Sequence, residues 1–129
     1  MFKRVDHIGV IVDDLAEARG FLVDVGLELD REFHDPGRLD AAFYRCGDTM
    51  IEVIEINDVK EREERLGGDR ARIEHLAVEV ADMEQTLAAL AALGVRTKTP
   101  EARKIGATLN IWTEPQSSDG VVYQLVQKL

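Results

Sequence analysis

Short apolar runs, separated by turn residues, dominate the hydrophobic pattern of this chain. Residues 4–12 are rich in Val and Ile and alternate with polar residues, which predicts a strand. Asp14 and Glu17 have the spacing of a capping box, so a helix is expected next, ending at Gly26. Strands are also predicted at 27–33, 39–46 and 50–56, with turn residues at 34–37. The first part of the chain therefore predicts a βαβββ module.

The same pattern then returns. Residues 73–80 align with 5–12 without a gap, so that His75 falls on His7 and Gly94 falls on Gly26. The second copy predicts strands at 72–80, 95–98, 108–113 and 121–127, a helix from Asp82 to Leu93, and a loop over 99–107. A repeat of this length indicates two copies of one structural unit.

The repeat sets our expectation for the fold class and the domain organisation. We expect an α+β fold in which two tandem βαβββ modules form a curled mixed sheet around a cleft. Module one covers 1–56, a charged linker covers 57–71, and module two covers 72–129. Both modules belong to a single domain, 1–129, because each half-sheet needs a partner.

Composition narrows the classes of function and partner. A net charge of −9 argues against binding to nucleic acid, which requires a basic surface. A single cysteine, Cys46, excludes a disulfide within the chain and fits a reducing compartment. No apolar run is long enough to cross a membrane or to act as a signal peptide. We therefore expect a cytoplasmic protein without a membrane partner.

Two histidines and two polar strand residues are the candidates for chemistry. His7 and His75 occupy the same place in the repeat. In the last strand of each module, the segments 50–54 and 122–126 each place one polar residue, Glu52 or Gln124, among apolar neighbours. A carboxylate in such a strand is costly to bury unless it is paired. Two imidazoles and two oxygen donors suit a divalent ion such as Co, Ni, Zn, Fe or Mn. The pattern thus predicts a metal-binding cleft.

A purely structural interpretation of these residues stays open. Histidines in strands often satisfy backbone groups, and Glu52 could pair with a nearby arginine such as Arg45. The equivalent positions of the four residues favour the metal interpretation.

The paired modules, with His and then Glu or Gln in each, resemble the vicinal oxygen chelate superfamily of glyoxalases, bleomycin-resistance proteins and dioxygenases. Within it, the chain is most similar to the methylmalonyl-CoA epimerases, and the resemblance covers essentially the whole chain. The segments that carry the resemblance are 6–10, 48–52, 73–77, 104–107 and 120–125. Of these, the Lys-Ile-Gly-Ala segment at 104–107 is the most specific to the epimerases.

The resemblance implies a ligand set and a reaction. It makes His7, Glu52, His75 and Gln124 the metal ligands of an isomerase that epimerises a 2-methyl-branched malonyl-type acyl-CoA through a metal-stabilised enolate. It also identifies Asp40, which together with Glu52 gives two candidate bases. The epimerases usually carry Glu, also a base, where this chain has Gln124. An amide can ligate a metal through its oxygen but cannot accept a proton at neutral pH.

Other residues are candidates for substrate binding or have an alternative role. The phosphates of CoA need cations, and Lys98, Arg103 and Lys104 lie in the densest basic run, which could equally be a solvated loop. Asp40 could equally be a solvated residue at a strand edge. Related proteins cover their sheet edges by pairing, so a homodimer is expected.

Two other functions remain open from the sequence. The first is a glyoxalase-like isomerase or lyase that acts on another small oxygenated substrate. The second is a metal-free protein that binds a drug or metabolite, as resistance proteins of this superfamily do. Metal content separates the second from the enzymes.

Overall fold

The computed structural model describes residues 1–129. These residues form two compact units. The N-terminal unit is His7–Glu74, and the C-terminal unit combines Met1–Asp6 with His75–Leu129. The boundary between the units runs through two strands, β1 (Phe2–Val12) and β5 (Ala71–Val80), so each unit contains a segment of both.

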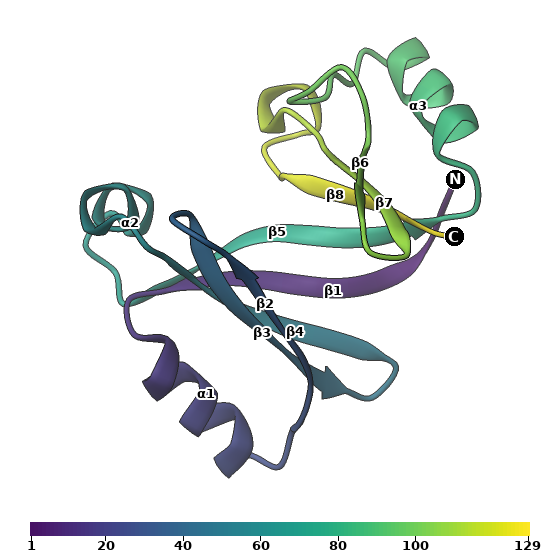
Figure 1. Cartoon of the computed structure of the whole chain (residues 1–129). Helices are drawn as coiled ribbons and strands as arrows, with labels where there is room; N and C mark the ends of the chain where they lie inside the picture. The colour runs from purple at the N-terminus through teal and green to yellow at the C-terminus, as the bar shows by residue number, and fades with distance from the viewer. The chain divides into compact units, whose positions relative to one another are not determined.

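The N-terminal unit contains the first βαβββ module. After β1 come α1 (Leu15–Asp24), β2 (Glu28–Asp35), β3 (Leu39–Cys46), β4 (Thr49–Ile56) and α2 (Val59–Leu66). The strands pair in the order β2-β3-β4-β1, in which β1 is parallel to β4 and the other pairs are antiparallel. The predicted module is confirmed (Figure 1).

The C-terminal unit repeats this topology. After β5 come α3 (Met83–Ala92), β6 (Arg103–Ile105), β7 (Thr108–Trp112), a 3₁₀ turn at Pro115–Ser117, and β8 (Tyr123–Lys128). The strands pair in the order β5-β8-β7-β6, in which β5 is parallel to β8 and the other pairs are antiparallel. The α+β class, with parallel and antiparallel pairing in both modules, is therefore confirmed.

Each helix begins at an aspartate, as the capping pattern predicts. Asp14 accepts a hydrogen bond from the Glu17 amide at 3.0 Å, and Asp82 accepts one from the Gln85 amide at 2.9 Å. The helices then bury a single stripe against their own sheet: Leu22 of α1 belongs to a core cluster with residues of β3 and β4. α1 therefore covers the sheet face opposite the one that carries His7 and Glu52.

Two predicted elements differ from the structure. Residues 95–98 do not form a strand and contribute only an isolated bridge, Thr97 to Thr113. The edge strand is instead β6, Arg103–Ile105, within the segment expected to be a loop. Gly106, at φ +58°, allows a tight turn, and Thr108 closes it by donating its hydroxyl to the Ile105 carbonyl at 2.9 Å. A strand of three residues is too short to show the alternation used for prediction.

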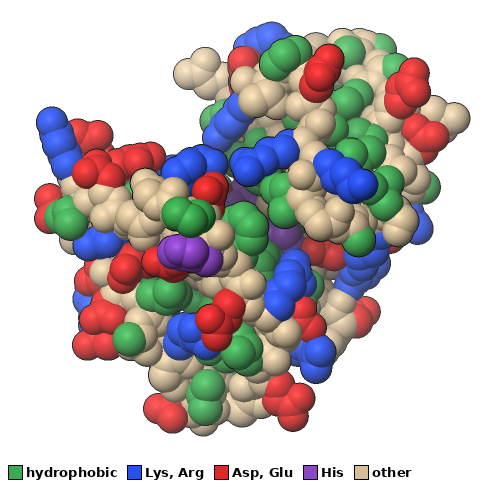
Figure 2. Space-filling view, viewed as in Figure 1, with side chains coloured by type: hydrophobic (Ala, Val, Ile, Leu, Met, Phe, Trp, Pro, Cys, Tyr) green, Lys and Arg blue, Asp and Glu red, His purple; other side chains and the backbone are tan.

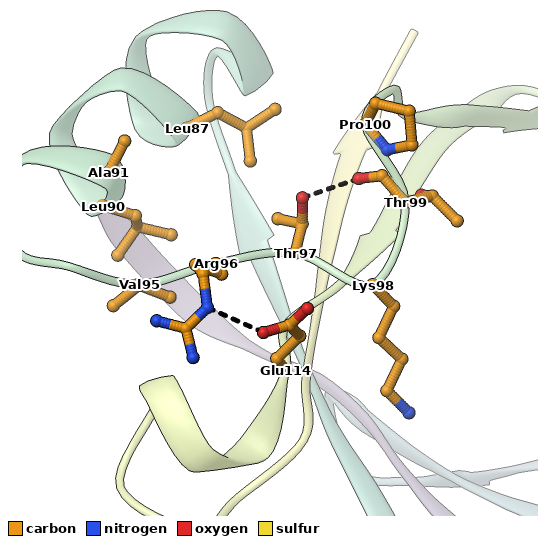
Figure 3. A pocket seen from close by; sticks show the side chains of 10 residues that line it. All are labelled: Leu87, Leu90, Ala91, Val95, Arg96, Thr97, Lys98, Thr99, Pro100 and Glu114. Carbon is orange, nitrogen blue, oxygen red and sulfur yellow. Dashed lines mark hydrogen bonds and ion pairs between the residues drawn. The ribbon is translucent and has the colours of Figure 1, made fainter.

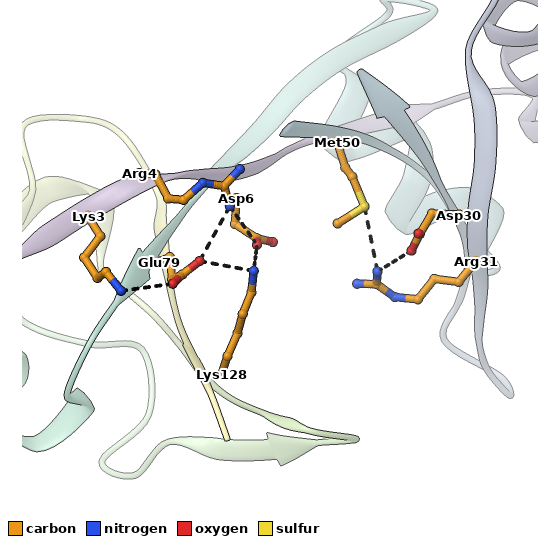
Figure 4. A network of polar contacts seen from close by, with 8 residues as sticks. All are labelled: Lys3, Arg4, Asp6, Asp30, Arg31, Met50, Glu79 and Lys128. Atoms are coloured by element: carbon orange, nitrogen blue, oxygen red, sulfur yellow. Dashed lines mark hydrogen bonds and ion pairs between the residues drawn. The ribbon is translucent and has the colours of Figure 1, made fainter. Parts of the chain in front are cut away.

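Charged side chains are interspersed over the face of the protein shown in Figure 2. In the C-terminal unit, Glu79 bonds to Lys128 at 3.1 Å and to Arg4 at 3.5 Å (Figure 4). The hydrogen bond from Lys128 is the main reason that the pKa of Glu79 lies below its ordinary value. This network ties together segments of β1, β5 and β8. None of the helices has the length and apolar character needed to span a membrane.

Candidate metal centre

His7 and Glu52 are brought together in the N-terminal unit. The Nε2 atom of His7 lies 3.3 Å from Oε1 of Glu52, and both residues are buried. The parallel pairing of β1 with β4 places Gly9 opposite Glu52, so the ligand pair is offset by two residues and lies on one face. A buried carboxylate beside an imidazole is the arrangement that the sequence predicts for this module.

An aromatic ring lies next to this pair on the same face. Phe43 is opposite Glu52 in the β3–β4 register, and its ring meets the His7 ring edge-on, with the ring centroids 5.2 Å apart. The ring is buried and excludes water from one side of the imidazole. The face thus combines a polar pair with an apolar wall, as small-molecule sites usually do.

The C-terminal unit repeats the pair in the same register. Ala77 is opposite Gln124 in the parallel pairing of β5 with β8, as Gly9 is opposite Glu52. His75 precedes Ala77 by two residues, so it shares the face of Gln124. Both His75 and Gln124 are buried. Each unit therefore presents one imidazole and one oxygen-bearing side chain from equivalent positions.

A chain of hydrogen bonds orients the Gln124 amide. The Ile105 carbonyl can only accept, so the Thr108 hydroxyl donates to it and in turn accepts from Asn110 Nδ2 at 2.8 Å. Asn110 Oδ1 then accepts from Gln124 Nε2 at 2.9 Å. Because its nitrogen is committed to Asn110, the carbonyl oxygen of Gln124 is the atom that can bind a cation.

These donors fit a divalent metal ion. Neutral imidazole nitrogens, a carboxylate oxygen and an amide oxygen are ligands that first-row divalent ions accept. The fixed orientation of Gln124 matters most, because an amide presented through its nitrogen could not bind a cation. Hydrogen bonds of this kind, donated by a ligand side chain to a neighbouring residue, are common around protein metal sites.

Asp40 lies away from the His7–Glu52 pair. It is three residues before Phe43 in β3, so the two side chains lie on opposite faces of that strand. Its carboxylate is hydrogen-bonded to Nδ1 of His34 and to Nδ2 of Asn57, the latter at 3.1 Å. The hydrogen bond to His34, followed by the one from Asn57, holds the pKa of Asp40 below its ordinary value.

The three predicted substrate-binding cations occupy different positions. Arg103 is opposite Asn110 in the β6–β7 register and therefore shares the face of Gln124, whereas Lys104 is opposite Leu109 on the other face. Lys98 donates its backbone N–H to the carbonyl of Trp112 at 2.8 Å. All three side chains belong to exposed residues.

Lys98 also lines a cavity of about 500 Å³ beside α3 (Figure 3). Leu87, Leu90 and Ala91 form its helical wall. Arg96 borders the cavity, but its guanidinium is paired with Glu114 at 2.8 Å. Lys98 is thus the only one of the three predicted cations that borders this space.

Sequence reasoning missed Asn110 and Arg31. Asn110 is a polar residue between Leu109 and Ile111, which is the same signal that identified Glu52 and Gln124. Arg31 lies on β2 opposite Phe43, and only the pairing register shows that it shares the face of Glu52. The first residue could have been found from its pattern, and the second could not.

Comparison with solved structures shows the same fold elsewhere. Methylmalonyl-CoA epimerase from Mycobacterium tuberculosis matches with a TM-score of 0.87 at 25% identity, covering 99% of this chain and 89% of that chain. A hypothetical protein from Bacillus halodurans matches with a TM-score of 0.85 at 22% identity, covering 98% and 94%. A variant of the Streptomyces coelicolor methylmalonyl-CoA epimerase, in complex with 2-nitronate-propionyl-CoA, matches with a TM-score of 0.83 at 21% identity, covering 99% of this chain and 99% of that chain.

Sequence comparison shows the family. No curated protein sequence matches the chain. A family profile matches residues 6–111, which include His7, Glu52 and His75. This chain belongs to the Glyoxalase/Bleomycin resistance protein/Dioxygenase superfamily, the vicinal oxygen chelate superfamily.

Proposed function

We propose that the protein is a metal-dependent acyl-CoA isomerase of the methylmalonyl-CoA epimerase type. The observation that carries this proposal is the repeated ligand pair, His7 with Glu52 and His75 with Gln124, in one register. A solved epimerase of the same fold is in complex with methylmalonyl-CoA, which supports the choice of substrate class. In this proposal the two modules act as a single domain, and the two pairs together bind one divalent ion.

Glu52 is the proposed base. With both imidazoles acting as ligands, it is the ligand side chain able to take the α-proton of the substrate, while the proton that completes inversion comes from the opposite face, from solvent or a group outside the four ligands. A bound divalent ion supplies Lewis-acid stabilisation of the negative charge that develops on the thioester oxygen. Gln124 contributes an oxygen donor without proton chemistry. In the same proposal, Lys98 and Arg103 bind the phosphates of CoA, and the protein works as a cytoplasmic homodimer.

Deuterium exchange tests this function. The protein is purified without added metal, its metal content is measured, and it is then incubated in D₂O with one enantiomer of methylmalonyl-CoA. We expect a stoichiometric divalent metal and deuterium at the α-carbon, both lost in His7→Ala. No exchange above the His7→Ala control would reject the epimerase reaction. Protein that holds no metal yet binds a ligand would instead be a binding protein.

A glyoxalase-like isomerase is the second candidate, and Gln124 is the observation that favours it. Inversion at carbon needs a proton donor on the face opposite the base, whereas a proton shift on one face needs a single base. Glu52 is the one carboxylate among the four ligands. Deuterium exchange without inversion of methylmalonyl-CoA would favour this single-base chemistry, and exchange with inversion would favour the epimerase.

A further inference from the structure

Arg31 lies on the same sheet face as the proposed base. It is opposite Phe43 in the β2–β3 register, and Phe43 is opposite Glu52 in the β3–β4 register. Directly opposed residues share a face, so Arg31, Phe43 and Glu52 form a row across three strands. A shift in register between Leu29 and Arg31 marks a bulge at this point in β2. Bulges near sites often redirect a side chain.

The contacts of Arg31 hold its guanidinium over the Phe43 ring and next to Met50. Its Cζ atom lies 4.0 Å from the centroid of the Phe43 ring, and the edge of that ring meets His7. Its Nη1 atom is 3.8 Å from Sδ of Met50, the residue opposite His7 in the β1–β4 register (Figure 4). Stacking on a buried ring restrains the guanidinium without using its N–H donors.

Arg31 and Arg45 share one carboxylate partner at this end of the face. Asp30 bonds to Arg31 at 2.9 Å and to Arg45 at 2.8 Å, so one carboxylate faces two guanidinium groups. These hydrogen bonds, that of Arg31 first, hold the pKa of Asp30 below its ordinary value, so it is ionised at neutral pH. One carboxylate cannot occupy the donors of two arginines.

We infer that Arg31 binds a free carboxylate of the substrate, and that the site therefore selects acyl groups that carry such a carboxylate. The guanidinium matches a carboxylate through two parallel hydrogen bonds. The phosphates of CoA are separated from the thioester by the pantetheine arm, so an anion beside Glu52 belongs to the acyl group. The inference rests on the proposed function in one respect, the position of the reacting carbon beside Glu52. The binding of an anion by Arg31 does not depend on the proposed reaction.

Calorimetry with two small probes tests the inference on metal-loaded protein. Malonate carries the carboxylates and malonamide has the same skeleton without charge. We expect Arg31→Gln to weaken malonate binding about 10- to 100-fold, the range for a hydrogen bond between charged groups, and to leave malonamide binding unchanged. Arg31→Lys should recover only part of the affinity, because an ammonium group lacks the paired donors.

Arg19→Gln is the matched control. Arg19 also lies over an aromatic ring, 5.9 Å from the centroid of Tyr44, and bonds to the Tyr44 hydroxyl and to Glu32. Tyr44 lies on the sheet face covered by α1, so this variant removes an equal charge from the opposite face. We expect wild-type affinity for malonate. Equal losses of malonate affinity in Arg19→Gln and Arg31→Gln would mean that the affinity depends on the net charge of the protein and not on Arg31, and would reject the inference.

The outcomes separate this inference from the proposed reaction. If malonate binding depends on Arg31 but methylmalonyl-CoA shows no exchange, the anion site stands and the epimerase reaction fails. If exchange occurs and Arg31→Gln binds malonate like wild type, the reaction stands and the inference fails. Wild-type protein that binds malonate no better than malonamide would also reject it. A Tm near that of wild type shows that each variant is folded.

Discussion

The two ligand pairs occupy equivalent positions in their modules and differ in their chemistry. Glu52 is opposite Gly9, which follows His7 by two residues. Gln124 is opposite Ala77, which follows His75 by two residues. The first pair ends in a carboxylate that can exchange a proton, and the second ends in an amide that cannot. The repeat therefore determines where these four side chains lie, and the side chain at each position determines the chemistry available to each half.

The residues around the two pairs also differ, with a charged neighbour beside the first pair and a neutral one beside the second. Glu52 lies in a row with Phe43 and the cation Arg31, a setting suited to a reacting acid group. Gln124 is instead fixed by Asn110 through a neutral hydrogen bond of 2.9 Å. We interpret the first half as the reactive half and the second as an orienting half. Substitutions that make the halves alike test this interpretation.

Glu52→Gln should have the largest effect, because it gives both halves an amide. The metal remains bound through the new amide oxygen, while proton transfer loses its base. We expect deuterium exchange into methylmalonyl-CoA to fall about 10³-fold, within the range for general base catalysis. Exchange is followed by mass spectrometry and metal by elemental analysis.

Glu55→Gln provides the control for that loss. Glu55 lies on the same strand but on the opposite face, where its carboxylate accepts from the Leu15 amide at 3.1 Å. Glutamine keeps an acceptor for this bond, so exchange should stay at the wild-type rate. A loss of exchange in both variants, or in neither, would contradict the role of Glu52.

Gln124→Glu makes the halves alike in the other direction. It adds a second proton-transfer group to the orienting half, which inversion requires. Starting from one enantiomer of methylmalonyl-CoA, we expect the ratio of inversion to exchange to rise about 10²-fold, since a general acid contributes on this scale. Chiral analysis of the recovered acyl group measures it. An unchanged ratio would mean that inversion depends on another residue.

Asn110→Ala tests the orienting half itself. Without Asn110 Oδ1, the Gln124 amide can turn its nitrogen towards the metal. We expect metal affinity to fall about 10- to 100-fold, as for loss of other groups that orient ligands. Asn110→Asp keeps the acceptor and should restore most of the affinity. Metal titration that shows no difference between the Ala and Asp variants would contradict this orienting role.

The sequence was sufficient to predict the repeat and the equivalent positions of the two histidines, Glu52 and Gln124 in the two modules. Strong alternation, capping aspartates and a polar residue between apolar neighbours in each closing strand are local signals, and β3 was predicted at its observed bounds, Leu39–Cys46. Strand β6 escaped prediction because three residues held by a hairpin turn carry no periodic signal. The contacts between side chains on different strands could not be predicted either, because the stacking of Arg31 on Phe43 depends on a strand register that only the folded sheet defines.

Asp40 shows the same limit, and its substitution should have the smallest effect. The sequence places it in the predicted strand 39–46, but the register puts it on the face opposite Phe43 and Glu52. We therefore expect the Asp40→Asn variant to catalyse deuterium exchange into methylmalonyl-CoA at close to the wild-type rate, in contrast to the Glu52→Gln variant. Loss of exchange in Asp40→Asn, with metal retained, would restore it as a base.

Asp40 should instead affect the pH dependence of stability. Its hydrogen bonds to His34 and Asn57 lower its pKa in the folded protein below the ordinary value of 3.8. A carboxylate with a lowered pKa stabilises the fold above its ordinary pKa, and this contribution is lost as the pH falls below 3.8 through the lowered value. The Tm of wild type should therefore exceed that of Asp40→Asn at neutral pH, and the gap should close below 3.8. A gap that is independent of pH would show that the carboxylate does not contribute through its charge.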